Sequence, residues 1–197
     1  MRTIGALIFP GFEILDLFGP LEMFGMLPDE FNARIIAQGH DPVASTQGPR
    51  TAVDVTTNNM QCCDLLLVPG GAGTRTEVHN GELLGWIKSV SAQAEIVMSV
   101  CTGSALLAQA SVLDGKRATT NKRAFDWVCS QAPEVAWVRR ARWVHDGNVY
   151  TSSGVSAGID MSLAVISQLL VQETAEQVAS WAEYQWNDDP GNDPFAT

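Results

Sequence analysis

Three short, almost wholly apolar segments constrain the fold of this chain more than any other feature of the sequence. They are Thr3–Phe9, Asp64–Pro69 and Ile96–Val100. Continuous apolar runs of this length are typical of strands buried on both faces of a parallel sheet. Because parallel strands need crossover connections, which are usually helical, the sequence predicts helices that cover both faces of such a sheet.

Between these strands, apolar residues recur at helical spacing. Glu82–Ala94 and Gly154–Val171 each carry an apolar stripe along one helical face, and Glu173–Trp186 continues as a further helix. The helix after the first strand is expected to begin near Gly19-Pro20, because proline is favoured in a first helical turn. Asp16 would then lie in the turn that joins the first strand to this helix.

Two more strands and one hairpin complete the expected sheet. Asn32–Gln38 is predicted to be a strand, and Ala52–Thr57 alternates as an edge strand does. Asp146-Gly147 lies between two β-rich arms, which predicts an antiparallel hairpin. We therefore expect a single three-layer α/β domain over residues 1–187, with a mostly parallel sheet and helices on both faces, followed by a tail at 188–197.

Charge and hydropathy exclude several classes of function. The 197 residues include 22 Asp and Glu against 12 Lys and Arg, and the formal charge of −10 disfavours nucleic acids and anionic lipids as partners. No apolar run reaches the ~18–20 residues that a membrane-spanning helix needs. Four cysteines without a disulfide pattern, and a first segment unlike a signal peptide, lead us to expect reduced thiols in the cytoplasm.

Cys101 has the sequence setting of a nucleophile. It follows the Ile96–Val100 strand directly, a helix is predicted at Thr102–Ala110, and the small residues Ser99 and Gly103 flank it two places away. This pattern is typical of a nucleophile elbow, a strand-to-helix turn too sharp for bulky neighbours. Because a helix N-terminus stabilises a thiolate, we expect Cys101 to have a lowered pKa and to be nucleophilic at neutral pH.

Asp16 is the expected proton-transfer partner of this cysteine. Loops at the carboxyl ends of parallel strands converge on one crevice, which would bring together Asp16, Gly70-Gly71 and Cys101-Thr102. There the backbone N–H groups of Gly71 and Thr102 would stabilise developing negative charge. An ordinary helix cap at Asp16 and an ordinary turn at the glycines are the alternatives.

The other residues that often carry chemistry are expected to be without a catalytic role. The glycine-rich segments lack the spacing of dinucleotide and phosphate loops, and no metal-ligand spacing occurs, so we expect no cofactor and no metal. Surface or structural positions are expected for His40, His79, His145, Cys62, Cys63 and Cys129.

Four sequence blocks, spread over most of the chain, resemble the ThiJ/PfpI superfamily, whose fold is similar to that of class I glutamine amidotransferases. The isonitrile hydratase branch is the most similar. Two of the blocks, L-D-x-x-G-P and the C-T-G-S elbow, also occur in ligand-sensing domains of AraC-type transcription regulators. The blocks are Phe9–Glu22, Val68–Gly73, Ser99–Ser104 and Ala157–Asp160.

The resemblance implies roles for three residues and a quaternary state. Cys101 would be the nucleophile, Asp16 its carboxyl partner and general acid/base, and Thr102 a further active-site contact. The chain departs from the hydratases at Asn121-Lys122, where they have a His-Trp pair. The resemblance also implies a homodimer, for which the apolar interface candidates are Trp181, Tyr184 and Trp186.

The implied chemistry is a cofactor-free hydration of a small isonitrile, R–N≡C. The sulfur of Cys101 adds to the terminal carbon, Asp16 supplies a proton to the nitrogen, and water converts the thioimidate to an N-formamide. Two alternatives are another cysteine hydrolase (an amidase, a peptidase or a glycation-repair enzyme) and a non-catalytic ligand or redox sensor. The lack of histidine at position 102 disfavours amide cleavage, because an amine leaving group must be protonated.

Overall fold

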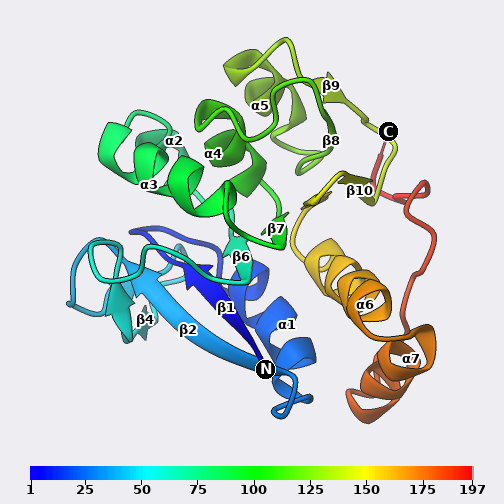
Figure 1. The fold of residues 1–197 in the computed structure, drawn as a ribbon. Helices are drawn as coiled ribbons and strands as arrows, with labels where there is room; N and C mark the ends of the chain where they lie inside the picture. Colours follow the sequence, from blue (N-terminus) through cyan, green and yellow to red (C-terminus); the bar gives the residue numbers. More distant parts are fainter. Residues whose placement is uncertain (197) are drawn as a thin grey trace.

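The computed structural model describes residues 1–196, and its centre is a seven-stranded sheet (Figure 1). Neighbouring strands are parallel except for one antiparallel pair at an edge, as the apolar segments and the single hairpin predict. In spatial order the strands are β10 (Trp143–Asp146), β11 (Val149–Ser152), β7 (Ile96–Ser99), β6 (Leu65–Val68), β1 (Arg2–Leu7), β2 (Phe31–Ala37) and β5 (Val55–Thr56).

The three predicted apolar strands occupy the middle of this sheet. β6 pairs in parallel with β1 on one side and with β7 on the other, and every residue of β6 and β7 is buried. β5 forms an edge, as its alternating pattern predicts, and β10 with β11 forms the predicted hairpin. Gly147 in the hairpin turn has a φ of 66°, a conformation that glycine adopts without strain.

Helices cover both faces of the sheet. Figure 1 shows α1, α6 and α7 packed together on one side, and α2 to α5 grouped on the other, which confirms the three-layer prediction. No helix within residues 1–196 combines the length and hydropathy needed to cross a membrane. The helices are α1 (Ile14–Gly25), α2 (Thr74–Glu77), α3 (Gly81–Ser91), α4 (Gly103–Gln109), α5 (Phe125–Gln131), α6 (Ala157–Leu169) and α7 (Gln172–Trp181).

Four two-residue strands lie outside the main sheet and form two small pairs. The antiparallel pair lies between β2 and β5, and the two strands of the parallel pair flank α5 in the sequence. These strands are β3 (Val43–Ala44), β4 (Arg50–Thr51), β8 (Arg117–Ala118) and β9 (Ala136–Trp137).

The expected start of α1 is wrong, and the error concerns the site. The helix begins at Ile14 rather than near Gly19-Pro20, so Asp16 lies in its first turn and not in a preceding loop. Pro20 stands inside the helix, where it has no N–H to donate to the carbonyl of Asp16. The buried apolar face of α1, which includes Leu17, holds the helix together across this missing bond.

Two of the three interface candidates are held within their own chain. The hydroxyl of Tyr184 donates to Asp160 Oδ1 at 2.9 Å, and Trp186 Nε1 donates to the Asp160 carbonyl at 3.1 Å. Trp181, in contrast, is 56% exposed. Of the three aromatic residues, only Trp181 therefore presents a large apolar surface to solvent.

The described part of the tail, up to residue 196, lies against the domain. The N–H of Arg142 donates to the Pro190 carbonyl at 2.8 Å, and the N–H of Asp193 donates to the Arg140 carbonyl at 3.0 Å. The Asp193 carboxyl is buried, 3.6 Å from Lys122 Nζ and 3.8 Å from Arg142 Nη1. This ion pairing attaches residues 190–196 beside the loop that contains Lys122.

Candidate active site

Cys101 lies between the end of β7 and the start of α4, on the predicted sharp turn. Its φ of 57° is in the left-handed region, which a non-glycine residue rarely adopts. The surrounding structure holds it there, because the Cys101 N–H donates to the Ser153 carbonyl at 3.1 Å. The Cys101 carbonyl in turn accepts from the hydroxyls of Thr120 at 2.9 Å and Ser104 at 3.1 Å. The strand-to-helix elbow predicted from the small flanking residues is therefore present.

The crowding at this turn explains why Gly103 is required. A Cβ added there would lie 2.3 Å from the Val68 carbonyl oxygen and 2.8 Å from that of Pro69. Both contacts are with backbone atoms of the neighbouring strand and loop, which cannot move aside as a side chain can. The elbow thus packs directly against the glycine loop that follows β6.

Asp16 is completely buried beside Cys101. Its Oδ2 accepts a hydrogen bond from the Gly70 N–H at 2.9 Å, and its carboxyl group interacts with the Cys101 side chain. Burial raises the pKa of Asp16 to about 8, although the Gly70 N–H opposes the shift, and the nearby charge of Glu13 adds to it. Asp16 Oδ1 is buried and has no hydrogen-bond partner within residues 1–196. Asp16 is therefore protonated at neutral pH, with Oδ1 as the oxygen available to carry the proton.

The expectation of a lowered pKa at Cys101 is wrong. Burial is the main cause that raises the pKa of this thiol, and the charge of Asp16 raises it further. The N–H of Thr102 and the side chains of Asn121 and Thr102 act in the opposite direction but do not reverse the shift. The unliganded pair is therefore a neutral thiol beside a neutral carboxylic acid.

The two loop glycines have different roles from those expected. Gly70 N–H donates to Asp16, and Gly71 N–H donates to Thr102 Oγ1 at 3.1 Å, so neither is directed at a position where a substrate would develop charge. A Cβ on Gly70 would lie 2.9 Å from Asp16 Oδ2, and one on Gly71 would lie 2.3 Å from the Gly11 carbonyl oxygen. These glycines position Asp16 and Thr102, and of the predicted donors only the Thr102 N–H faces the sulfur.

Asn121 is a site residue that sequence reasoning noticed only as a departure from the hydratases. Its Oδ1 accepts from the N–H groups of Arg123 at 2.9 Å and Ala124 at 3.1 Å. With the oxygen occupied in this way, the Nδ2 end of the amide is the part that can donate to the Cys101 sulfur. Asn121 therefore supplies a side-chain hydrogen-bond donor to the sulfur.

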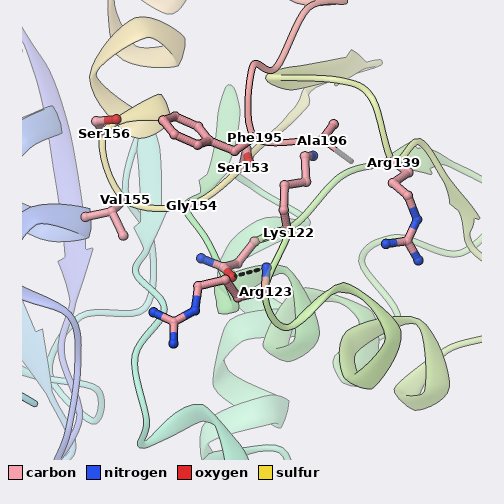
Figure 2. Close-up of a pocket in the computed structure, with 10 residues that line it drawn as sticks. Lys122, Arg123, Arg139, Ser153, Gly154, Val155, Ser156, Phe195 and Ala196 are labelled. Carbon is pink, nitrogen blue, oxygen red and sulfur yellow. Dashed lines mark hydrogen bonds between the residues drawn. The ribbon is translucent and has the colours of Figure 1, made fainter.

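A pocket of about 500 Å³ lies next to this constellation (Figure 2). Asn121 and Ser153, which both contact Cys101, form part of its wall. The rest of the wall comes from the loop after β8, from the loop after β9, from the segment before α6, and from the tail. Residues from these segments that line it include Lys122, Arg123, Arg139, Val155 and Phe195.

The remaining candidates lie apart from the site. His40, His79 and His145 are all exposed, and His145 stacks on Tyr150 with ring centroids 4.1 Å apart. All four cysteines are free thiols; Cys62 is exposed, and burial raises the pKa of Cys63 to about 11. Among residues 1–196, no group of three or more His, Cys, Asp or Glu side chains is arranged to hold a metal ion.

Comparison with known proteins gives four informative similarities. Residues 2–168 match the sequence pattern of the DJ-1/PfpI family. Isonitrile hydratase from Pseudomonas putida is 37% identical over 182 residues, which are 92% of this chain and 78% of the hydratase. The crystal structure of a ThiJ/PfpI family protein from Pseudomonas syringae has 32% identity and a TM-score of 0.87, over 98% of this chain and 77% of that one. The transcriptional regulator CdhR of Pseudomonas aeruginosa is 27% identical over 88% of this chain but only 52% of the regulator.

Proposed function

The chain belongs to the DJ-1/PfpI family, and from this premise we propose that it hydrates an isonitrile to an N-formamide without a cofactor. One observation carries the proposal: a buried carboxylic acid, Asp16, faces the thiol of Cys101 on a strained strand-to-helix turn. The similarity to isonitrile hydratase supports the choice of reaction. Cys101 is the nucleophile, Asp16 the proton-transfer group, and Thr102 a contact to the sulfur.

In the first step the thiol adds to the isonitrile. The sulfur of Cys101 forms a bond to the terminal carbon, and Asp16 gives its proton to the substrate while it takes the proton of the thiol. Sulfur and one hydrogen are then both on the former isonitrile carbon, as the neutral thioimidate R–N=CH–S–Cys. A carboxyl group protonated at neutral pH suits this exchange, because its charge is the same before and after the step.

In the second step water hydrolyses the thioimidate. The oxygen of water bonds to the carbon, and a proton reaches the nitrogen through Asp16. The carbon–sulfur bond then breaks, the hydroxyl proton returns to the sulfur, and R–NH–CHO is released with Cys101 restored as a thiol. The Thr102 N–H and the Asn121 amide, which both interact with the sulfur, stabilise the negative charge that develops there as it leaves.

A second candidate is a non-catalytic ligand sensor. The similarity to the regulator CdhR favours it, because most of this chain matches about half the length of a transcriptional regulator. Turnover separates the two candidates, since a sensor binds its ligand and releases it unchanged.

The decisive experiment mixes the purified protein with phenyl and cyclohexyl isonitriles at neutral pH and follows the formyl hydrogen of the products by NMR. We expect the matching N-formamides in amounts far above the protein concentration. A heat-denatured sample is the control for uncatalysed hydration. Absence of both formamides with the folded protein would refute the hydratase proposal and favour the sensor.

We also propose that the protein is a homodimer, as the family resemblance implies. Large apolar side chains exposed on α1 and α7 support this: Phe18 is 42% exposed, Leu15 41% and Trp181 56%. Closed two-fold pairs are the commonest oligomers of soluble proteins. We expect light scattering to give twice the chain mass; a stable monomer over a wide concentration range would contradict this proposal.

A further inference from the structure

The pocket beside the elbow contains three cationic side chains, and we propose that it binds an anionic group, a carboxylate, on the substituent R of the substrate. The inference rests on the proposed function in one respect, because it takes the reacting end of the ligand to be the isonitrile at Cys101. It goes further by naming the substrate class: an isonitrile that carries an apolar spacer and a carboxylate.

The composition of the pocket wall is unlike that of the whole chain. Lys122, Arg123 and Arg139 line it, and none of the lining residues in the described structure is Asp or Glu (Figure 2). The whole chain, in contrast, has a formal charge of −10. A concentration of positive charge in one concave site of an acidic protein favours an anion there and repels cations.

The three cations differ in how far their charge is already compensated. Lys122 lies 3.6 Å from the buried carboxylate of Asp193, and Arg139 forms an ion pair with Asp126. Arg123 has no ion-pair partner among residues 1–196, and its side chain is exposed. Arg123 is therefore the group with an uncompensated charge to offer to a ligand.

Lys122 is further restricted by the hydrogen bonds that it donates. Its Nζ donates to the Ala141 carbonyl at 2.7 Å and to Thr119 Oγ1 at 2.9 Å, both in the protein interior. Because the ammonium group of Lys122 already donates these hydrogen bonds, it is less available to donate to a ligand. We therefore assign Lys122 a background contribution to the positive potential and Arg123 the direct contact.

The pocket is connected to the reacting sulfur through residues that touch both. The Asn121 side chain interacts with the Cys101 sulfur, and its Oδ1 accepts the Arg123 N–H at 2.9 Å. Ser153 also lines the pocket, and its carbonyl accepts the Cys101 N–H at 3.1 Å. A ligand with its isonitrile carbon at the sulfur can therefore extend its substituent past Asn121 toward Arg123.

Two further features of the surroundings suit an anionic substrate. Phe195 and Val155 give the pocket an apolar section, against which an aryl or alkyl spacer can pack. The acid that contacts the sulfur, Asp16, has its pKa raised to about 8 by burial, so at neutral pH it is mainly uncharged and repels a carboxylate only weakly.

The test uses two pairs of compounds that differ only in a carboxylate. Binding is measured by calorimetry at low salt with the unreactive products 4-formamidobenzoate and formanilide, and turnover with 4-isocyanobenzoate and phenyl isonitrile. The proteins are the parent, Arg123→Gln and Arg34→Gln, the last being a control that removes an exposed arginine on β2, outside the pocket. Circular dichroism checks that all three are folded.

We expect the parent to bind the carboxylate compound about tenfold more tightly than formanilide, the ratio that one charge-assisted contact of about 1.4 kcal/mol gives. The preference should fall to threefold or less in Arg123→Gln and stay unchanged in Arg34→Gln. We expect the kcat/KM values of the two isonitriles to show the same ratios, and the difference to lie in KM rather than in kcat. Equal binding of the two formamides by the parent, or a preference that survives Arg123→Gln, would overturn the inference even if both isonitriles are hydrated. A preference that Arg123→Gln abolishes supports it even if neither isonitrile is hydrated, in which case only the proposed reaction fails.

Discussion

The elbow and the pocket beside it differ in burial, in charge and in the way the chain builds them. At the elbow, Asp16 is fully buried and Cys101 is only 7% exposed, and both side chains are neutral at pH 7. The pocket is open and positively charged, with Arg123 exposed on its wall. The elbow consists of segments that follow core strands, whereas the pocket consists of loops and the tail.

This difference separates the chemistry of the site from its selectivity. Buried groups packed against backbone atoms, such as Gly103 against the Val68 carbonyl, have little freedom to change without loss of the fold. Exposed loop residues such as Arg123 can change while the core stays intact. We therefore assign bond formation and proton transfer to the elbow and the choice of substituent to the pocket.

The largest effect is expected at Cys101, the proposed nucleophile. Cys101→Ala should abolish isonitrile hydration, a loss greater than the ~10²–10⁴-fold typical of general acid/base steps, because the proposed covalent intermediate forms on the Cys101 sulfur. Cys62→Ala, at an exposed cysteine outside the site, is the matched control and should keep the parental rate. Formamide production by each variant is the measurement, with thermal unfolding as a check of the fold. Substantial turnover by folded Cys101→Ala would show that the cysteine at the elbow is not the nucleophile.

Next in size is the effect of removing the transferable proton. Asp16→Asn keeps a polar side chain of the same shape against Gly70 but cannot exchange a proton, so single-turnover hydration should slow by about 10²–10⁴-fold. Binding of the product formamide should change much less, because the pocket is untouched. A near-parental rate in Asp16→Asn would show that water or another group delivers the proton.

The pH dependence of stability gives a smaller effect with a definite sign. The pKa of Asp16 is about 8 in the folded protein and near 3.8 in an unfolded chain, so folding favours the protonated form. Its stabilising contribution is complete below about pH 4 and is lost as the pH rises to 8 and above, by at most about 1.4 kcal/mol per pH unit. Urea unfolding at pH 5 and pH 8.5 measures the free energy of unfolding. Between these two pH values it should decrease more for the parent than for Asp16→Asn. Equal losses would mean that Asp16 is not held neutral by burial.

The smallest effects come from a pair of glycine variants, one in each region. Gly103→Ala places a Cβ 2.3 Å from a backbone carbonyl and should destabilise the fold by about 1–3 kcal/mol. Gly154→Ala places one 2.2 Å from the side-chain Nδ2 of Asn121, which can move, so we expect it to cost less stability. Gly154→Ala should instead slow hydration several-fold, since Asn121 is displaced from the sulfur. The free energy of unfolding in urea and the rate of turnover are measured for both variants. Equal losses of stability would contradict the contrast between a rigid elbow and an adaptable pocket.

Most of the fold follows from patterns that the sequence displays directly. β1, β6 and β7 could be predicted because a strand buried on both faces is apolar throughout, and parallel pairing then brings Asp16, Thr102 and Cys101 to one edge. The start of α1 could not, because Pro20 is typical of a first helical turn and only tertiary packing makes its internal position acceptable.

The errors at the site have a common physical cause, which is that burial depth and loop geometry have no periodic sequence signal. The helix N-terminus beside Cys101 predicts a lowered pKa, but burial outweighs it. Gly70 and Gly71 stand where donors were expected, yet their N–H groups are directed at Asp16 and Thr102. The pocket escaped prediction because its lining comes from separate loops and from the tail.

The central claim, that Cys101 forms a covalent bond with the isonitrile carbon, is tested most directly by mass spectrometry. Protein in excess is mixed with phenyl isonitrile carrying ¹³C at the terminal carbon, so that each protein molecule reacts at most once, and samples are quenched with acid at successive times and digested. We expect a mass increase of one isonitrile on the peptide that contains Cys101, which rises and then decays as labelled formamide appears. Formation of labelled formamide at the full rate while the label never occurs on that peptide, or occurs on Cys62 instead, would contradict the account.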